Sequence, residues 1–97
     1  MAKYYLTNLA IQDLAEIWNY TFAEWSEKQA NKYYKLLLRS CQELANYPKL
    51  GKHYELIEQD LLGYKSNHHS IFFKVKSNGE IEVIRILHER MDLKNKL

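Results

Sequence analysis

Two apolar stripes with helical spacing follow each other almost without a loop, and this restricts the fold more than any other feature of the chain. The first stripe comprises Ile11, Leu14, Trp18, Phe22 and Trp25. The second comprises Ala30, Tyr33, Leu37, Cys41 and Leu44. Between them, Ser26-Glu27-Lys28-Gln29 is a capping box, in which the serine side chain accepts from the amide three residues on.

The ends of both helices are also marked. Thr7 or Asn8 can cap the first helix, and Pro48 with Gly51 ends the second. Two long helices joined so tightly predict an antiparallel helical hairpin.

After residue 60 the pattern changes to short segments rich in Ile, Phe and Val. We expect strands over residues 3–6, 61–65, 69–76 and 80–87. Asn78-Gly79 predicts a two-residue type I′ turn between the last two. The sequence therefore predicts one α+β domain over residues 1–97: a short N-terminal strand, an antiparallel helical hairpin, and a three-stranded antiparallel meander.

A two-residue turn also fixes the pairing of the last two strands. One face then carries the pairs Ile71–Ile86, Phe73–Ile84 and His69–His88. The other face carries Ser70–Leu87, Phe72–Arg85 and Lys74–Val83. We expect the first face to pack on the hairpin and the second to be partly open, although a one-residue slip would exchange them.

Composition and charge restrict the class of protein. Cys41 is the single cysteine and reads as a small buried hydrophobe, which fits a reducing, cytoplasmic location. No signal peptide or membrane-spanning segment is expected. The net charge is +2, and residues 61–97 carry seven Lys/Arg against four Asp/Glu, a net of +3. This asymmetry favours an acidic partner at the C-terminal half as much as it favours a solvated sheet surface.

Polar residues gather where the last predicted strand ends, at His88-Glu89-Arg90-Met91-Asp92. One interpretation is a nuclease set of Lys65, His88, Glu89 and Arg90, because RNA cleavage needs proton transfer and cations on the phosphate. Another is a metal site formed by His68, His69 and His88 with Glu89 or Asp92. The spacing of these residues matches no strong zinc pattern and the sequence has no Cys pair, so no metal is expected.

No Gly-rich phosphate loop, serine nucleophile motif or carboxylate pair is present, so no cofactor is expected. The basic and aromatic residues of the chain do not form a recognisable platform for single-stranded nucleic acid. Direct nucleic-acid binding is therefore not expected. A protein-binding module is the default interpretation.

Several short segments of the chain occur in the same order and at similar spacings as in a known protein family. They are Asp13-Leu-Ala-Glu-Ile17, Tyr20–Trp25, Gln29-Ala30 with Tyr33, Leu44-Ala-Asn-Tyr-Pro48 with Gly51, His69-Ser-Ile-Phe-Phe73, and Val83-Ile-Arg-Ile-Leu-His-Glu-Arg-Met-Asp92. Together they resemble the ParE branch of the RelE/ParE toxins of bacterial type II toxin–antitoxin systems, over nearly the whole chain.

The resemblance implies a compact toxin with the RelE/ParE-like fold, neutralised by a small antitoxin that wraps it. The ParE branch is associated with poisoning DNA gyrase, whereas the RelE branch cleaves mRNA in the ribosomal A site. Shared fold does not settle function. The RelE-type site uses strand lysines, a central arginine, and a late arginine often followed by tyrosine.

This chain departs from that site. It has only Lys65 on the second strand and Ser70 at the central position, and no tyrosine follows Arg90. Other relatives cleave with glutamate, arginine and histidine, so His88 keeps nuclease activity open.

The leading hypothesis is therefore a toxin that inhibits gyrase by binding. The alternatives are an mRNA endonuclease and an inactive antitoxin-binding relative. The expected target-binding residues are Arg85, His88, Arg90, Met91 and Asp92. The expected antitoxin-binding residues are Trp18, Phe22, Tyr33 and Tyr34, because such a small domain cannot bury them all deeply. An antitoxin strand could add at the sheet edge formed by residues 61–65 or 3–6.

Overall fold

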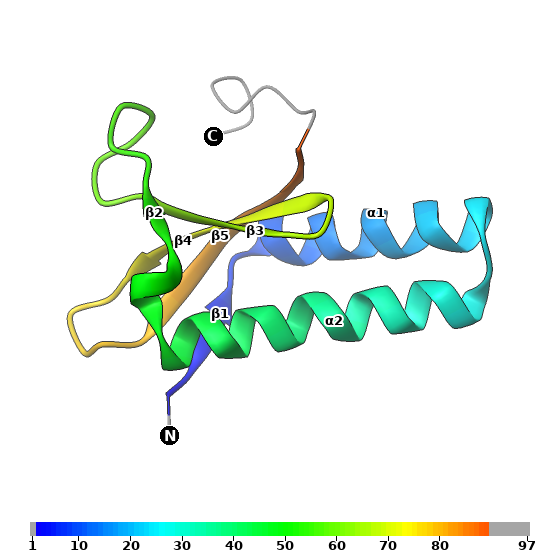
Figure 1. The fold of residues 1–97 in the computed structure, drawn as a ribbon, viewed down its shortest axis with the longest axis horizontal. Helices are drawn as coiled ribbons and strands as arrows, with labels where there is room; N and C mark the ends of the chain where they lie inside the picture. The colour runs from blue at the N-terminus through cyan, green and yellow to red at the C-terminus, as the bar shows by residue number, and fades with distance from the viewer. Residues whose placement is uncertain (1, 90–97) are drawn as a thin grey trace.

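Two long helices pack side by side on a five-stranded sheet in the computed structural model, which describes residues 2–89 (Figure 1). The sheet order is β1-β5-β4-β3-β2, with β1 parallel to β5 and the other neighbours antiparallel. The elements are β1 (Tyr4–Leu6), α1 (Asn8–Glu24), α2 (Glu27–Asn46), the 3₁₀ helix η1 (Pro48–Leu50), β2 (Lys52–His53), β3 (Leu62–Ser66), β4 (His69–Val75) and β5 (Ile81–His88). The predicted α+β architecture is confirmed.

The helix starts follow the predicted capping chemistry. Thr7 caps α1 and accepts a hydrogen bond from the Ala10 amide, and Ser26 caps α2 and accepts from the Gln29 amide. Neither helix combines the length and apolar character that a membrane span requires.

The predicted stripe of α2 is confirmed, whereas that of α1 is largely wrong. Ala30, Leu37, Cys41 and Leu44 are fully buried, and burial raises the pKa of Cys41 to about 12. On α1 only one stripe residue, Leu14, is buried.

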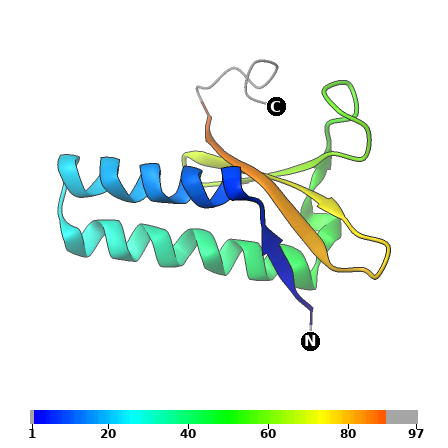
Figure 2. The same ribbon diagram turned by 180° about the vertical axis from the view of Figure 1, so that it is seen from behind.

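Two residues of the α1 stripe, Phe22 and Trp25, are exposed because they lie in the part of the hairpin that extends beyond the sheet. Ile11, in the first turn of α1, is exposed as well, and Trp18 is half-buried. Ile11, Phe22 and Trp25 expose 51%, 49% and 74% of their surface. Both views show the hairpin running on past the strands, so among residues 2–89 the far half of α1 packs mainly against α2 (Figures 1 and 2). The apolar periodicity of a sequence predicts which residues form a stripe on a helix, but it does not predict how much of that stripe the sheet covers.

The pairing of β4 with β5 matches the expectation only at the end far from the turn. There the pairs are His69–His88, Ser70–Leu87, Ile71–Ile86 and Phe72–Arg85, as predicted. A β-bulge after Phe72 then shifts the register. Nearer the turn the pairs are Phe73–Val83, Lys74–Glu82 and Val75–Ile81, so the predicted Phe73–Ile84 and Lys74–Val83 pairs are wrong.

The turn explains the shift. The Lys76 amide donates to the Glu80 carbonyl at 2.7 Å, which closes a three-residue loop, and only Gly79 of that loop has positive φ, at 88°. The predicted type I′ turn is therefore wrong. The bulge compensates for the extra loop residue, and Val83 rather than Ile84 joins the core under the helices.

The second sheet face is also covered, against expectation. Phe72 and Leu87 are buried with Leu61 in a separate apolar cluster, over which the segment between β2 and β3 lies. The ring of Tyr54 packs edge-on against Phe72. Gly63 permits this contact, because a Cβ there would lie 2.6 Å from the Tyr54 ring.

One sheet edge agrees with the prediction, and the other differs from it in detail. Strand β1 is one edge, as expected for residues 3–6. At the other edge the short strand β2, within a segment without clear period, pairs with Leu62 and Gly63, so residues 61–65 are not a fully open edge.

Asp13 fastens α1 to the edge of β5 beyond the point where β1 ends. Its carboxylate accepts from Arg85 Nε at 2.8 Å, from Arg85 Nη2 at 2.9 Å, and from the Ile86 amide at 3.0 Å. The side chains of Asp13 and Arg85 expose only 8% and 15% of their surface. Thr7 adds a hydroxyl bond to the Ile84 carbonyl at 2.7 Å. These side chains supply the partners that a neighbouring strand would otherwise provide.

We predict that Asp13→Ala lowers the free energy of unfolding by about 3–5 kcal/mol, because it removes the buried carboxylate that accepts from both the Arg85 guanidinium and the Ile86 amide. Urea denaturation measures the change. The control is Glu58→Gln, which removes the more exposed pair with Lys74 and is expected to cost at most about 1 kcal/mol. Equal losses in the two variants would contradict the anchoring role of Asp13.

Candidate functional site

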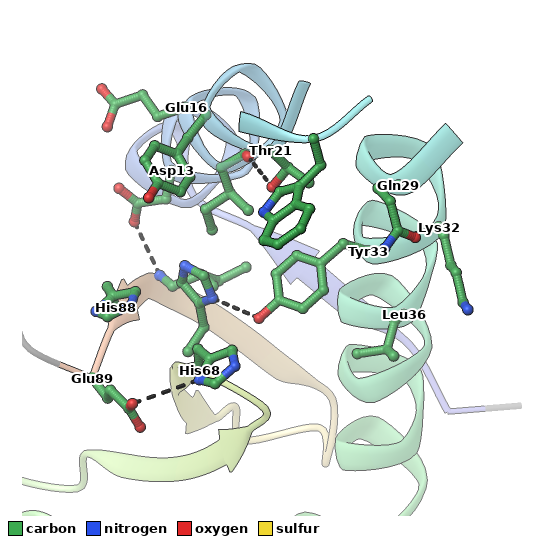
Figure 3. Close-up of a pocket in the computed structure, with 15 residues that line it drawn as sticks. Asp13, Glu16, Thr21, Gln29, Lys32, Tyr33, Leu36, His68, His88 and Glu89 are labelled. Carbon is green, nitrogen blue, oxygen red and sulfur yellow. Dashed lines mark hydrogen bonds and ion pairs between the residues drawn. The ribbon is translucent and has the colours of Figure 1, made fainter. Parts of the chain in front are cut away.

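A groove of about 960 Å³ lies between the two helices and the ends of β4 and β5 (Figure 3). One wall is α1, the other is α2, and the floor is formed by the histidine-rich strand ends. The lining side chains include Glu16, Tyr20, Trp25, Lys32, Tyr33, Leu36, His68, His69, His88 and Glu89. The groove therefore combines exposed aromatic rings near the hairpin tip with titratable groups at the sheet.

A cross-strand imidazole pair forms the floor. His69 and His88 face each other in the β4–β5 ladder, as predicted, with ring centroids 5.2 Å apart. The Tyr33 hydroxyl lies 2.7 Å from Nδ1 of His69 and ties α2 to the sheet. Figure 3 shows Tyr33 reaching from α2 toward the strands.

The floor is poorly suited to positive charge. Burial, and then the neighbouring His88 and His68, lower the pKa of His69 to about 4. Burial likewise raises the pKa of Tyr33. At neutral pH these two groups are uncharged and hydrogen-bonded, which fits a rigid polar contact between helix and sheet.

Glu89 contacts both Lys65 and His68 beside the groove. Its carboxylate lies 2.9 Å from Lys65 Nζ and 3.6 Å from His68 Nδ1, and the hydrogen bond with Lys65 lowers the pKa of Glu89. The Glu89 amide also donates to the His68 carbonyl. The tight turn between β3 and β4 brings these residues together, with Asn67 at a positive φ of 59°.

The nuclease residues expected from the sequence are thus partly assembled. Lys65 and Glu89 form an ion pair, and His88 lies beside His69 in the same groove. Arg90 lies outside the described residues. Within residues 2–89, no three His, Cys, Asp or Glu side chains are arranged to hold a metal ion.

Of the expected target-binding residues, Arg85 and His88 lie in the described chain. The guanidinium of Arg85 is bonded to Asp13, and this bond raises the pKa of Arg85. Arg90, Met91 and Asp92 lie outside the described residues. A target contact at any of these positions stays a prediction.

The four expected antitoxin-binding aromatics do not share one surface. Only Tyr33 lines the groove, while Tyr34 packs half-buried against the core. Trp18 and Phe22 stack on a different side of α1, with centroids 5.2 Å apart, and Trp18 Nε1 donates to Asn31.

Two groove aromatics were missing from the expected set. Tyr20 and Trp25 line the groove and expose 66% and 74% of their surface. Helical spacing already places Tyr20 away from the Leu14 side of α1, and that signal could have identified it.

Solved structures share this fold. A chain of the chromosomal ParDE toxin–antitoxin system from P. aeruginosa superposes with a TM-score of 0.78 at 20% identity, covering 91% of this chain and 96% of that one. A chain of the RelBE2 toxin–antitoxin complex from Mycobacterium tuberculosis superposes with a TM-score of 0.58 at 15% identity, covering 91% and 98%. The fold is therefore one found in toxin–antitoxin systems.

Sequence comparison defines the family. Residues 4–93 match the family model described as ParE toxin of type II toxin-antitoxin system, parDE. Toxin ParE1 from Mycobacterium tuberculosis is 31% identical over 96 residues, covering 99% of this chain and 98% of that protein. Toxin ParE from Escherichia coli is 33% identical over 97 residues, covering 100% and 94%. This chain belongs to the ParE toxin family.

We predict that stability falls as the pH drops from about 6.5 to about 4, because the unfolded state takes up a proton on His69 before the folded state does. Urea denaturation across this range, with an NMR titration of the imidazole, measures the effect. His69→Gln is expected to flatten the dependence, and His53→Gln, at a histidine whose side chain is 76% exposed, is the control. A dependence that survives in His69→Gln would contradict the assignment.

Proposed function

We propose that this chain is a toxin that inhibits DNA gyrase by binding it and is neutralised by a cognate antitoxin. The observation that supports the proposal most is the match of residues 4–93 to the ParE toxin family. The relatives at 30% identity or more are all named as ParE toxins, including Toxin ParE1 from Caulobacter vibrioides.

The charges of the groove support binding over bond cleavage. Phosphodiester cleavage needs a proton acceptor, a proton donor and cations placed on the phosphate. In the described chain Lys65 is paired with Glu89, Arg85 is bonded to Asp13, and His69 is held uncharged by burial. We propose that the end of β5 and residues 90–92 form the docking surface for gyrase.

An endoribonuclease is the second candidate, and one contact favours it. Lys65, Glu89 and His68 lie together beside the groove, so a carboxylate and a cation could act on one substrate there. Arg90 would complete this set. In this case toxicity results from cleavage of mRNA instead of inhibition of gyrase.

We propose that the antitoxin wraps the hairpin tip. Exposed aromatics occur both inside the groove, at Tyr20 and Trp25, and on the other side of α1, at Phe22. A single short contact cannot cover both sides, whereas an amphipathic segment that crosses the tip can. The neighbouring ParDE and RelBE2 structures, each described as a toxin–antitoxin assembly, support such a partner.

We predict that the purified protein inhibits gyrase supercoiling and that His88→Ala and Arg90→Ala each raise the required concentration about 10-fold, since truncating an interface anchor has that effect. Lys52→Ala, on the exposed strand β2, is the control. No inhibition at stoichiometric excess would exclude the gyrase proposal. Primer extension showing cuts in the ribosomal A site would support the endoribonuclease, and unimpaired growth without antitoxin would indicate an inactive relative.

We predict that Phe22→Ser weakens antitoxin binding by about 10-fold, because it removes an exposed ring from the proposed contact. Isothermal titration with the antitoxin measures this. Leu56→Ser is the matched control, since Leu56 is fully exposed in the segment between β2 and β3. Equal affinities of the Phe22 and Leu56 variants would contradict wrapping at the tip.

A further inference from the structure

Four cations form a straight row on the outer side of α2. They follow each other at steps of four, three and four residues, which places them on one side of a helix: Lys28, Lys32, Lys35 and Arg39. All four side chains are exposed, and they lie on the side of α2 opposite to its buried residues. At 1.5 Å per residue the row is about 16 Å long. Both views show α2 along one long border of the molecule (Figures 1 and 2).

Within residues 2–89, these cations differ from three cations of the sheet strands, Lys65, Lys74 and Arg85, in having no acidic partner. Lys65 is paired with Glu89, Lys74 with Glu58, and Arg85 with Asp13. In contrast, none of the four residues of the row forms an ion pair with any acid of residues 2–89. Even Glu43, one turn after Arg39, forms no ion pair with it. The row is therefore a concentrated positive field that the net charge of +2 conceals.

The neighbourhood of the row identifies the class of ligand. A protein partner needs an apolar anchor at the centre of its interface, and no apolar side chain lies within the row. A single-stranded nucleic acid would stack its bases on aromatic rings, and the row has none. A duplex backbone needs only regularly spaced cations. The Cβ atoms of residues three or four apart on a helix are about 5–6 Å apart, so the row presents its charges at regular intervals.

We propose that the outer side of α2 binds the phosphate backbone of duplex DNA without sequence preference. The contact is made by these four cations, which form no ion pair within residues 2–89. It lies away from the end of β5, and one of the four, Lys32, also lines the groove. It does not rest on gyrase being the target, since it predicts DNA binding by the protein alone. It also replaces the expectation from the sequence that direct nucleic-acid binding is absent.

The test is fluorescence anisotropy with a labelled 20-base-pair DNA duplex and the purified protein. We expect binding that weakens about 100-fold between 50 and 200 mM salt, as four phosphate contacts imply. The stripe variant carries Lys28→Gln, Lys32→Gln, Lys35→Gln and Arg39→Gln. The control variant carries Lys3→Gln, Lys49→Gln, Lys52→Gln and Lys76→Gln, which removes the same charge from other exposed positions.

The proposal requires that the stripe variant lose at least about 10-fold in affinity and most of the salt dependence while the control keeps both. Equal losses in the two variants would overturn it, as would no binding at 50 mM salt. Tighter binding to an RNA duplex or to poly-glutamate than to the DNA duplex would also overturn it, in favour of that ligand. Unchanged urea midpoints show that both variants remain folded.

Discussion

The contact of Asp13 with Arg85 and the Ile86 amide fixes helix α1 to the edge of strand β5. Within residues 2–89, β1 pairs with β5 as far as Val83, and no strand pairs with the rest of that edge of β5. The carboxylate of Asp13 takes the place of a neighbouring strand and fixes how far α1 lies along the sheet. This contact also helps to set the shape of the groove, because it fixes the wall formed by α1 relative to the floor formed by the ends of β4 and β5.

The sequence predicts well those features that depend on neighbouring residues. Both helix caps and most of the α2 stripe follow from local chemistry, and they are confirmed. The prediction fails where distant segments decide the outcome. The exposure of Phe22 depends on the reach of the sheet, and the burial of Phe72 depends on a connection without regular pattern.

In the candidate site, too, the sequence predicts the contacts set by local pattern but not those between distant segments. The opposition of His69 and His88 follows from the strand register, which is correct at that end of the hairpin. The bond between Tyr33 and His69 joins residues 36 positions apart, and no local pattern reveals it. Likewise, Arg85 reads as an exposed cation in the strand pattern, but a helix residue 72 positions earlier occupies its guanidinium.

The helical hairpin that extends past the strands has a consequence for local stability. In the part of the chain that the structure describes, its tip is held by contacts between α1 and α2, whereas its base also packs on the sheet (Figure 1). Opening of the tip therefore exposes little buried surface, and its amides are expected to exchange with solvent at a lower free energy than those of β4 and β5. A partner that binds the tip would suppress this opening. Its binding would therefore also stabilise the tip of the toxin against local unfolding.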